Sequence, residues 1–399
     1  MISQKFLKKI ALLVPPIRQV FAQRDELRNQ LGRVQQSVRS SWIHHRQYGE
    51  FNVNPAIGNG SSIDDKRIIE RLLAAYQRAD TNQYGKDSMW RDFFETHHKS
   101  SHEVFISGDI EKSREILSNP SSNNLFYGFD ELCSLFIHKF HDDPKGYSYA
   151  CQDNLIRLAE AIGVFSVECP EGAVWMLNQE KSTDEILHAI EVALGVELSF
   201  PDIYPGAIGL QSIRGIITYR AIQALYLAYR VRQITQDAIP QKAQPKICEI
   251  GAGLGRSALF ASQLGINNYT LVDVPMTIIS QGYYLMRCLG EDAVVLPGEA
   301  QKNNTQISLM HANDFLSSNA QFDLIVNVDS ITEFGQNLAL QYSKKISELS
   351  PAFLSINHES NKIRVINLLK QLDITYKASR YPYWMRQGYV EELVIFNRK

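Results

Sequence analysis

The stretch Lys246-Ile-Cys-Glu-Ile-Gly-Ala-Gly-Leu-Gly-Arg256 decides the fold class of this chain. Its apolar beginning predicts a buried strand, glycines follow at 251, 253 and 255, and a helical pattern starts after them. Glycine adopts positive φ and lets a ligand approach the backbone, while the N-terminus of a helix offers free N–H groups. We therefore predict a nucleotide-binding turn in which Gly251, Gly253 and Gly255 contact the ligand.

Two classes of cofactor use this layout, and the spacing separates them. Dinucleotide binders need G-x-G-x-x-G, whose third glycine allows close packing of helix on strand. Arg256 occupies that third position here, so a dehydrogenase is a weak alternative. The spacing is instead E-x-G-x-G-x-G, with Glu249 two residues before the first glycine. This resembles motif I of the class I methyltransferases that use S-adenosylmethionine.

Acidic residues follow the next two predicted strands. Asp273 ends the run Tyr269–Val272, where its carboxylate can accept both ribose hydroxyls of an adenosine. Asp314 follows the run Ile307–Met310 and has two readings, an acceptor for the adenine amino group or a helix cap before Phe315. Both readings stay open at this stage.

The remaining C-terminal sequence alternates short apolar runs with helical stretches. Such alternation predicts a largely parallel sheet covered on both faces, here a Rossmann-like doubly wound sheet over residues 236–399. The other predicted strands are Phe322–Val326, Ala352–Ile356 and Leu393–Phe396.

The preceding residues predict two further parts. Residues 41–235 show mainly helical patterns and no catalytic motif, and we expect a helical accessory or lid region. Residues 1–40 contain a 3-4 apolar spacing that fits either a short coiled coil or an amphipathic helix on its own protein. Residues 1–48 carry nine lysines and arginines against two acidic residues, whereas the rest of the chain has a net charge of −9. A basic arm can approach anionic lipid or an acidic partner, and the acidic remainder disfavours nucleic acid.

Several segments together resemble the bacterial sugar O-methyltransferase family. They are Glu249–Arg256, the Leu-Val-Asp-Val-Pro of 271–275, the Gln-Gly-Tyr-Tyr-Leu of 281–285, and the Phe-Asp-Leu-Ile-Val-Asn-Val-Asp-Ser of 322–330 followed by Glu333-Phe334. The resemblance covers roughly residues 205–360. It implies methyl transfer from S-adenosylmethionine to a hydroxyl of a carbohydrate or glycoconjugate, in polysaccharide or glycolipid biosynthesis.

Catalytic groups in such sheets lie beyond the carboxyl ends of the strands. That rule selects Asp329 and Glu333 after the fourth strand and His358 after the fifth as candidate bases for deprotonating a hydroxyl. Asn327 is expected to line the methionine end of the cofactor. The acidic residues are too widely spaced to form a metal motif, and we predict no metal site.

Two alternatives to the sugar methyltransferase stay open. One is a methyltransferase that acts on another small molecule, a lipid or a protein. The other is a catalytically silent scaffold of a glycan-synthesis complex. Five scattered cysteines and the lack of a long apolar run favour a cytoplasmic protein, with peripheral contact at the inner membrane face through the lead helix. A coiled-coil lead helix would also make the protein a homo-oligomer.

Overall fold

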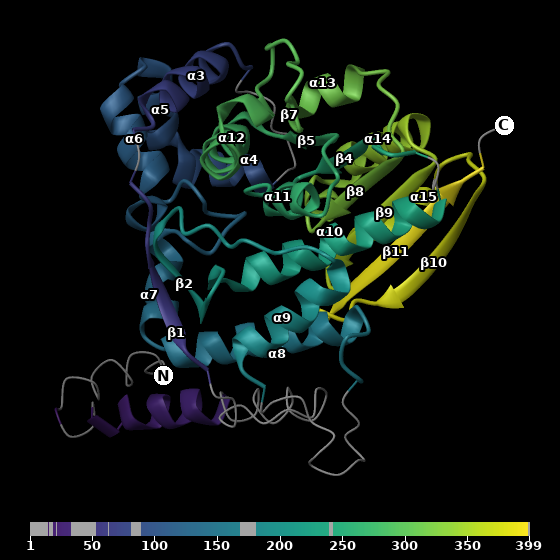
Figure 1. The fold of residues 1–399 in the computed structure, drawn as a ribbon. Coiled ribbons are helices and arrows are strands. Elements are labelled where there is room, and N and C mark those ends of the chain that lie inside the picture. The colour runs from purple at the N-terminus through teal and green to yellow at the C-terminus, as the bar shows by residue number, and fades with distance from the viewer. Residues whose placement is uncertain are drawn as a thin grey trace, which may run out of the picture. The chain divides into compact units, whose positions relative to one another are not determined.

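The computed structural model describes residues 15, 19–20, 22–32, 53–62, 64–80, 89–167, 181–238 and 242–397 (Figure 1). The chain divides into two compact units. One comprises residues 1–51 and 168–180, and the other comprises residues 52–167 and 181–399. The second unit holds every strand found in the described residues, and the site described below.

The second unit is built on an eight-stranded sheet with the order β10-β11-β9-β8-β4-β5-β7-β6. Neighbouring strands from β9 to β6 pair in parallel, and β11 pairs antiparallel with both β9 and β10. The strands are β4 (Ile247–Ile250), β5 (Tyr269–Asp273), β6 (Val294–Val295), β7 (Ile307–His311), β8 (Leu324–Val328), β9 (Ala352–His358), β10 (Tyr376–Pro382) and β11 (Tyr389–Phe396). The predicted Rossmann-like, largely parallel sheet is confirmed.

The direction in which strands are added reverses between β4 and β8. From β4 the chain adds β5 and β7 on one side, then crosses to add β8 and β9 on the other. Ligands of open α/β sheets bind in the crevice at such a switch point, outside the carboxyl ends of the strands. The turn after β4 and the segment after β8 therefore meet at the position expected for a site.

Helices cover both faces of the large sheet, as a doubly wound fold requires. An apolar cluster packs α13 (Ala312–Ser317), α14 (Gln336–Leu349) and α15 (Val365–Leu369) against one face. On the other side, α10 (Tyr219–Ala238) packs on α11 (Arg256–Gln263), which contacts α12 (Pro275–Leu289). Phe353 and Ile325 are fully buried in the first cluster, which shows how completely the sheet is covered.

The region before α10 adds helices and a small second sheet. The helices are α3 (Lys66–Gln77), α4 (Met89–Phe93), a π-helix (Phe94–His98), α5 (Lys99–Ser107), α6 (Ile110–Ser118), α7 (Ser134–His141), α8 (Pro144–Ala161) and α9 (Thr183–Leu194). The small sheet has the order β1-β2-β3, with β1 (Pro55–Asn59), β2 (Pro205–Ser212) and β3 (Gly215–Ile217) all antiparallel. Helix α3 packs on α12, so this region lies directly against the large sheet's helices (Figure 1). The division of the chain near residue 235 into accessory and nucleotide-binding domains stays a prediction.

Several elements differ from what the sequence pattern indicates, among them the unpredicted strands β2, β3 and β6. For three others the difference has a local reason. The apolar segment 213–234 has a helical pattern from its start, but α10 begins at Tyr219 because Gly215 has φ +113° and pairs with Ser212 in a tight hairpin. Strand β1 lies in a stretch whose sequence indicates a loop, since its buried residues Ala56 and Gly58 are small and give no apolar signal. Strand β10 has no counterpart among the predicted strands because nearly all of its residues are exposed at the edge of the sheet.

The predicted lead helix lies mostly outside the described residues. The part that is described, 19–20 and 22–32, is helical, and the seam residues Val20, Leu27 and Leu31 are 56–63% exposed. The coiled coil, the membrane contact and the homo-oligomer stay predictions. None of the helices in the described ranges combines the length and apolar character needed to cross a membrane.

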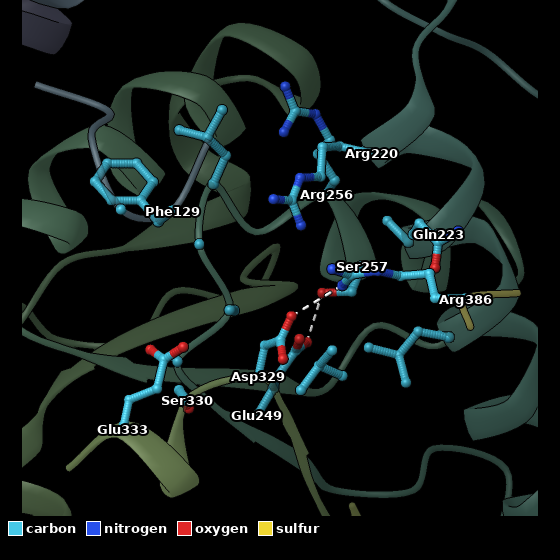
Figure 2. A pocket seen from close by; sticks show the side chains of 18 of the residues that line it. Phe129, Arg220, Gln223, Glu249, Arg256, Ser257, Asp329, Ser330, Glu333 and Arg386 are labelled. Atoms are coloured by element: carbon cyan, nitrogen blue, oxygen red, sulfur yellow. Dashed lines mark hydrogen bonds and ion pairs between the residues drawn. The ribbon is translucent and has the colours of Figure 1, made fainter. Parts of the chain in front are cut away.

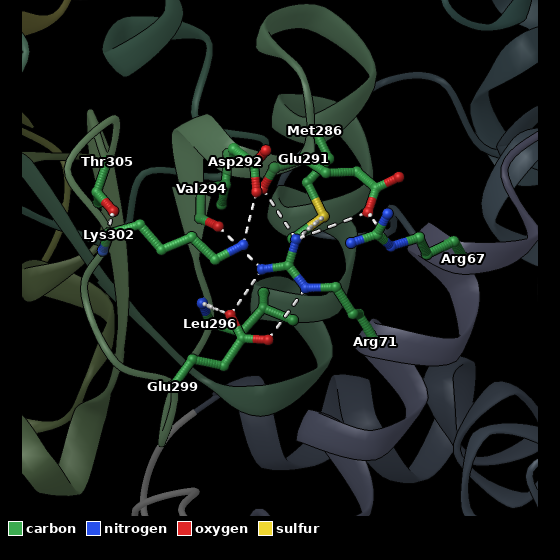
Figure 3. Close-up of polar contacts among 10 residues, drawn as sticks. All are labelled: Arg67, Arg71, Met286, Glu291, Asp292, Val294, Leu296, Glu299, Lys302 and Thr305. Atoms are coloured by element: carbon green, nitrogen blue, oxygen red, sulfur yellow. Dashed lines mark hydrogen bonds and ion pairs between the residues drawn. The ribbon is translucent and has the colours of Figure 1, made fainter.

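Arg71 of α3 joins the N-terminal helices to the large sheet (Figure 3). Its Nε and Nη2 donate to the two carboxylate oxygens of Glu299 at 3.0 and 2.6 Å. Nη1 and Nη2 also donate to the carbonyl oxygens of Glu291 and Val294 at 2.9 and 3.0 Å. The Arg71 side chain is only 18% exposed, so its planar guanidinium bridges the residues after α12 with little competition from water.

We predict that Arg71→Ala lowers the free energy of unfolding by about 2–4 kcal/mol, because the Glu299 carboxylate loses its cation and keeps only the Leu296 N–H as a donor, while two carbonyls lose the Arg71 N–H groups. Arg67→Ala is the matched control on the same helix. Arg67 also pairs with an acid, Glu291 at 3.1 Å, but its side chain is 77% exposed and its loss should cost less than about 0.5 kcal/mol. Urea denaturation of both variants measures the difference, and equal effects would contradict this account.

Candidate functional site

The turn after β4 has the backbone that its glycines predict. Gly251, Gly253 and Gly255 have φ of +73°, +57° and +78°, a region that other residues rarely adopt. A Cβ on Gly251 would lie far inside van der Waals contact with the Ser330 hydroxyl, and one on Gly255 would lie 2.8 Å from Leu271. The turn thus packs tightly against the segment after β8, and α11 begins directly after it.

A buried network of hydrogen bonds joins the ends of β4 and β8. The Asn327 amide donates to the Ile250 carbonyl at 2.9 Å and to the Ser330 hydroxyl at 2.5 Å, and Ser330 also donates to Ile250 at 3.0 Å. The Asn327 oxygen accepts from the Ile331 N–H and from Asn357. Asn327 is fully buried and borders neither of the two cavities described below, so the structure places it behind the glycine turn.

Glu249 lies at the centre of the sheet and is 2% exposed. One of its oxygens accepts from the Ser257 and Tyr269 hydroxyls at 2.5 and 2.7 Å. Burial raises the pKa of Glu249, while these two hydrogen bonds oppose the shift. The side chain also borders the large cavity described next, so it joins the start of α11 to the ligand space.

Two cavities open at the switch point and share the same walls. The large one, about 170 Å³, and the small one, about 60 Å³, are both bordered by Gly251, Gly253, Ser330, Trp90 and Phe129. The glycine turn forms one wall and the two aromatic rings form another. A ligand lying across the turn would therefore occupy both spaces.

The small cavity has one carboxylate and a largely apolar lining. Asp273, at the end of β5, accepts from the Val274 N–H and the Gln281 amide, each at 2.9 Å, and keeps lone pairs available. Burial raises the pKa of Asp273 to about 7, although these hydrogen bonds pull it down. The remaining lining includes Ala312, Phe334, Leu338 and Tyr342.

The large cavity has charged side chains among apolar ones, and Asp329 is one of them (Figure 2). Asp329 accepts from Arg386 Nη1 at 2.9 Å and from the Tyr389 hydroxyl at 2.8 Å. Among the described non-glycine residues it alone has positive φ, +62°, a strained backbone of the kind found at functional sites. Its carboxylate is thus held in place by two donors from β11 and the turn before it.

Glu333 faces the same cavity one short turn later. Burial, and to a smaller extent the nearby charge of Asp329, raise the pKa of Glu333 to about 8, although a hydrogen bond with Trp90 and the charge of Arg220 oppose the shift. Its protonation state therefore changes just above neutral pH. A carboxyl group with this behaviour can take up a proton from a ligand hydroxyl.

Besides Asn327 and Gly255, two further predicted site residues, Asp314 and His358, lie outside the lining of both cavities. Asp314 is exposed in the first turn of α13, whose N-cap is His311, so it neither caps the helix nor borders the small cavity; Ala312 of the same segment does. His358 Nδ1 contacts the Ser360 hydroxyl at 2.5 Å, and its ring packs on Tyr389. The structure therefore brings Glu249, Gly251, Gly253, Asp273, Asp329 and Glu333 to the two cavities, whereas Gly255 borders neither and packs on Leu271 and Leu285.

Several residues of the large cavity carried no signal in the sequence. Trp90 and Phe129 come from the N-terminal helical region, Arg220 and Gln223 from α10, and Arg386 from the β10–β11 turn. None belongs to a motif, and they are separated by up to about 300 residues in the chain. The arginines that interrupt the apolar segment 213–234, Arg220 among them, are the one feature of the sequence that could have indicated a polar cavity beside this helix.

Arg256, which also borders the large cavity, and the neighbouring tyrosines make contacts within the protein. Arg256 forms a buried ion pair with Asp130, and its guanidinium lies 5.7 Å from the centre of the Tyr284 ring. Tyr283 and Tyr284 are 0% and 5% exposed, so both lie on the buried face of α12. Within the described ranges, no three His, Cys, Asp or Glu side chains gather where a metal ion could bind.

Comparison with known proteins gives a likeness in structure only. No protein-family model matches the chain, and no curated protein matches it. The magnesium protoporphyrin IX methyltransferase of Synechocystis PCC 6803, solved with bound S-adenosylmethionine, is 12% identical with a TM-score of 0.32 over 45% of this chain and 84% of its own. The ribosomal protein L11 methylase of Lactobacillus delbrueckii subsp. bulgaricus is 12% identical, with a TM-score of 0.31 over 44% and 80% of the two chains. The fold class rests on the strand order given above.

We predict that Gly251→Ala damages the site more than its backbone strain alone explains. Gly265→Ala is the control, because Gly265 also has positive φ, +87°, but a Cβ there would meet nothing within 4 Å. Both variants should lose about 1 kcal/mol for the strained φ, and Gly251→Ala a further 1–3 kcal/mol or so for the collision with Ser330. Thermal or urea unfolding measures this difference, and equal losses would show that the turn has room to relax.

Proposed function

We propose that this protein is an S-adenosylmethionine-dependent O-methyltransferase acting on a sugar hydroxyl. The observation that supports this most directly is the pair of cavities joined at the glycine turn, one with a ribose-type carboxylate and the other with an ionisable Glu333. Such a pair fits a nucleoside cofactor on one side of the turn and an acceptor on the other.

The small cavity fits the adenosine part of the cofactor. Asp273 has lone pairs available for two ribose hydroxyls, and Tyr342, Phe334 and Leu338 offer apolar surface to a purine ring. The glycine turn would let the chain beyond the ribose run close to the backbone into the large cavity. Arg256 stands where the dinucleotide-binding motif has its third glycine, and its side chain forms a buried ion pair with Asp130. A dinucleotide cofactor is therefore disfavoured.

Glu333 is the base that the geometry favours. A sulfonium methyl is already activated, so the protein's tasks are to align a hydroxyl behind it, exclude water and accept the proton. As the oxygen–methyl bond forms and the sulfur–methyl bond breaks, the Glu333 carboxylate takes the hydroxyl proton. Asp329 is already bound to Arg386 and Tyr389, which suits it to orienting an acceptor. His358 lies outside the cavity lining and becomes the weaker candidate.

The sugar acceptor rests on the family resemblance and on the lining of the large cavity. Gln223, Asp329, Glu333 and Tyr383 supply amide, carboxylate and hydroxyl groups, which are the usual partners of sugar hydroxyls. Trp90 adds a flat apolar face beside them. A carbohydrate or glycoconjugate is therefore the partner we propose.

Asp273→Asn should weaken binding of S-adenosylhomocysteine by about 10- to 100-fold, since hydrogen bonds to a charged group contribute about 1.5–3 kcal/mol. Asp292→Asn, at a 66% exposed aspartate, is the control and should leave the affinity unchanged. Calorimetry with S-adenosylhomocysteine and with NAD measures both effects. Tight binding of NAD with no binding of S-adenosylhomocysteine would refute the proposed function.

The pH dependence of the stability of Glu333→Gln tests whether the pKa of Glu333 is raised, and this measurement needs no sugar substrate. A folded-state pKa of about 8, against an ordinary value of 4.5, means that the folded protein binds the extra proton between these limits. Wild-type stability should therefore fall, relative to the variant, as pH rises from about 4.5 to 8, by on the order of 1–3 kcal/mol. Urea denaturation at pH 5, 7 and 9 reads this out.

Activity gives the second readout for Glu333. Release of S-adenosylhomocysteine across a panel of sugar acceptors should rise with pH towards 8 in the wild type and fall about 10²- to 10⁴-fold in Glu333→Gln. A variant with full turnover and a wild-type pH profile would exclude Glu333 as the base.

A further inference from the structure

Arg220 is a cationic residue that borders the large cavity and has hydrogen-bond donors available for a ligand. It is the second residue of α10, and its side chain is 37% exposed (Figure 2). Within the described ranges it makes no hydrogen bond, and its buried Nε has no partner. Its nearest acidic group is Glu131, whose Oε2 lies 3.6 Å from Nε, beyond good hydrogen-bond length.

The other two arginines of the cavity are already occupied. Arg256 is paired with Asp130, and it is 15% exposed. Arg386 donates to Asp329 at 2.9 Å and to the Tyr389 hydroxyl at 2.5 Å, with its guanidinium 3.8 Å from the centre of the Tyr389 ring. Arginine has five donors in a rigid fork that matches a carboxylate. Arg220 is thus the one of these three that can offer that fork to a ligand.

The position of Arg220 indicates which anion it would meet. It borders the same cavity as the glycine turn and the first residues of α11, where N–H groups without intrahelical acceptors favour negative charge. If adenosine occupies the small cavity, the other end of the cofactor emerges across Gly251 and Gly253 into this space. That end is an amino acid, with one carboxylate and one ammonium group.

We propose that Arg220 binds the carboxylate of the methionyl group of S-adenosylmethionine. The inference rests on the proposed function and adds to it a cofactor ligand supplied by α10, outside the glycine motif. The same cavity contains acceptors for the ammonium group, since Asp329 and Glu249 both border it. The mixed charges of the cavity then match the zwitterion of the cofactor, with Arg220 as the partner of its negative end.

The test uses two ligands that differ only in this carboxylate. Calorimetry on the full chain compares S-adenosylmethionine with decarboxylated S-adenosylmethionine, in the wild type, Arg220→Met and Arg220→Lys. Arg220→Met should weaken binding of S-adenosylmethionine by about 10- to 100-fold, because a hydrogen-bonded charge pair is lost. Its affinity for the decarboxylated ligand should change by less than about threefold, and Arg220→Lys should fall between the two on S-adenosylmethionine.

Arg232→Met is the matched control on the same helix. Arg232 donates to the Leu194 carbonyl at 3.0 Å and does not border the cavity, so its loss should affect neither ligand. Equal weakening of both ligands by Arg220→Met would assign Arg220 a structural role beside Glu131 and overturn the proposal. Unchanged affinity of Arg220→Met for S-adenosylmethionine would also overturn it. This holds even if turnover of negatively charged sugar substrates falls, because Arg220 would then contact the substrate and not the cofactor. If the wild type binds neither ligand, the proposed function fails together with this inference.

Discussion

The site depends on one close contact, the packing of the Gly251 turn against Ser330. Only a residue without a Cβ fits there, and Asn327 and Ser330 satisfy the Ile250 carbonyl that the turn leaves exposed. β4 and β8 are the two neighbouring strands at which the strand order reverses. This contact therefore fixes the two loops that border the crevice at the carboxyl ends of these strands. The glycine turn, α11 and the Asp329–Glu333 segment take their positions from it.

Above this contact the cavity is organised by compensated charge. Arg386 neutralises Asp329 and Arg256 neutralises Asp130, whereas Glu333 avoids the cost of a buried charge through a raised pKa. Each group in a water-poor cleft needs either a partner or a proton, because an unpaired charge there is costly. Among the described residues, Arg220 has only its ion pair with Glu131 at 3.6 Å, so it keeps hydrogen-bond donors from which a ligand could accept.

The N-terminal region completes the site rather than standing apart from it. Trp90 and Phe129 form the aromatic wall shared by both cavities, and Arg71 ties α3 to the loop after α12 through Glu299. A free nucleotide-binding sheet would leave the glycine turn open to water on this side. The region before α10 thus supplies the aromatic wall of both cavities.

Features that depend on short-range pattern could be predicted from the amino-acid sequence. Buried strands such as Ile247–Ile250 are recognisable because both faces of a parallel strand are apolar, and Asp273 because the carboxylate follows such a run directly. The glycine turn was predictable because its φ values admit few other residues. Other features arise only in the folded chain: strand β10 has no buried face to produce a pattern, and Arg220, Trp90 and Arg386 reach one cavity from three distant segments. Folding also separates the roles of Asp329, Glu333 and His358, because the pairing, burial and cavity position of a side chain arise from neighbours that lie far away in the chain.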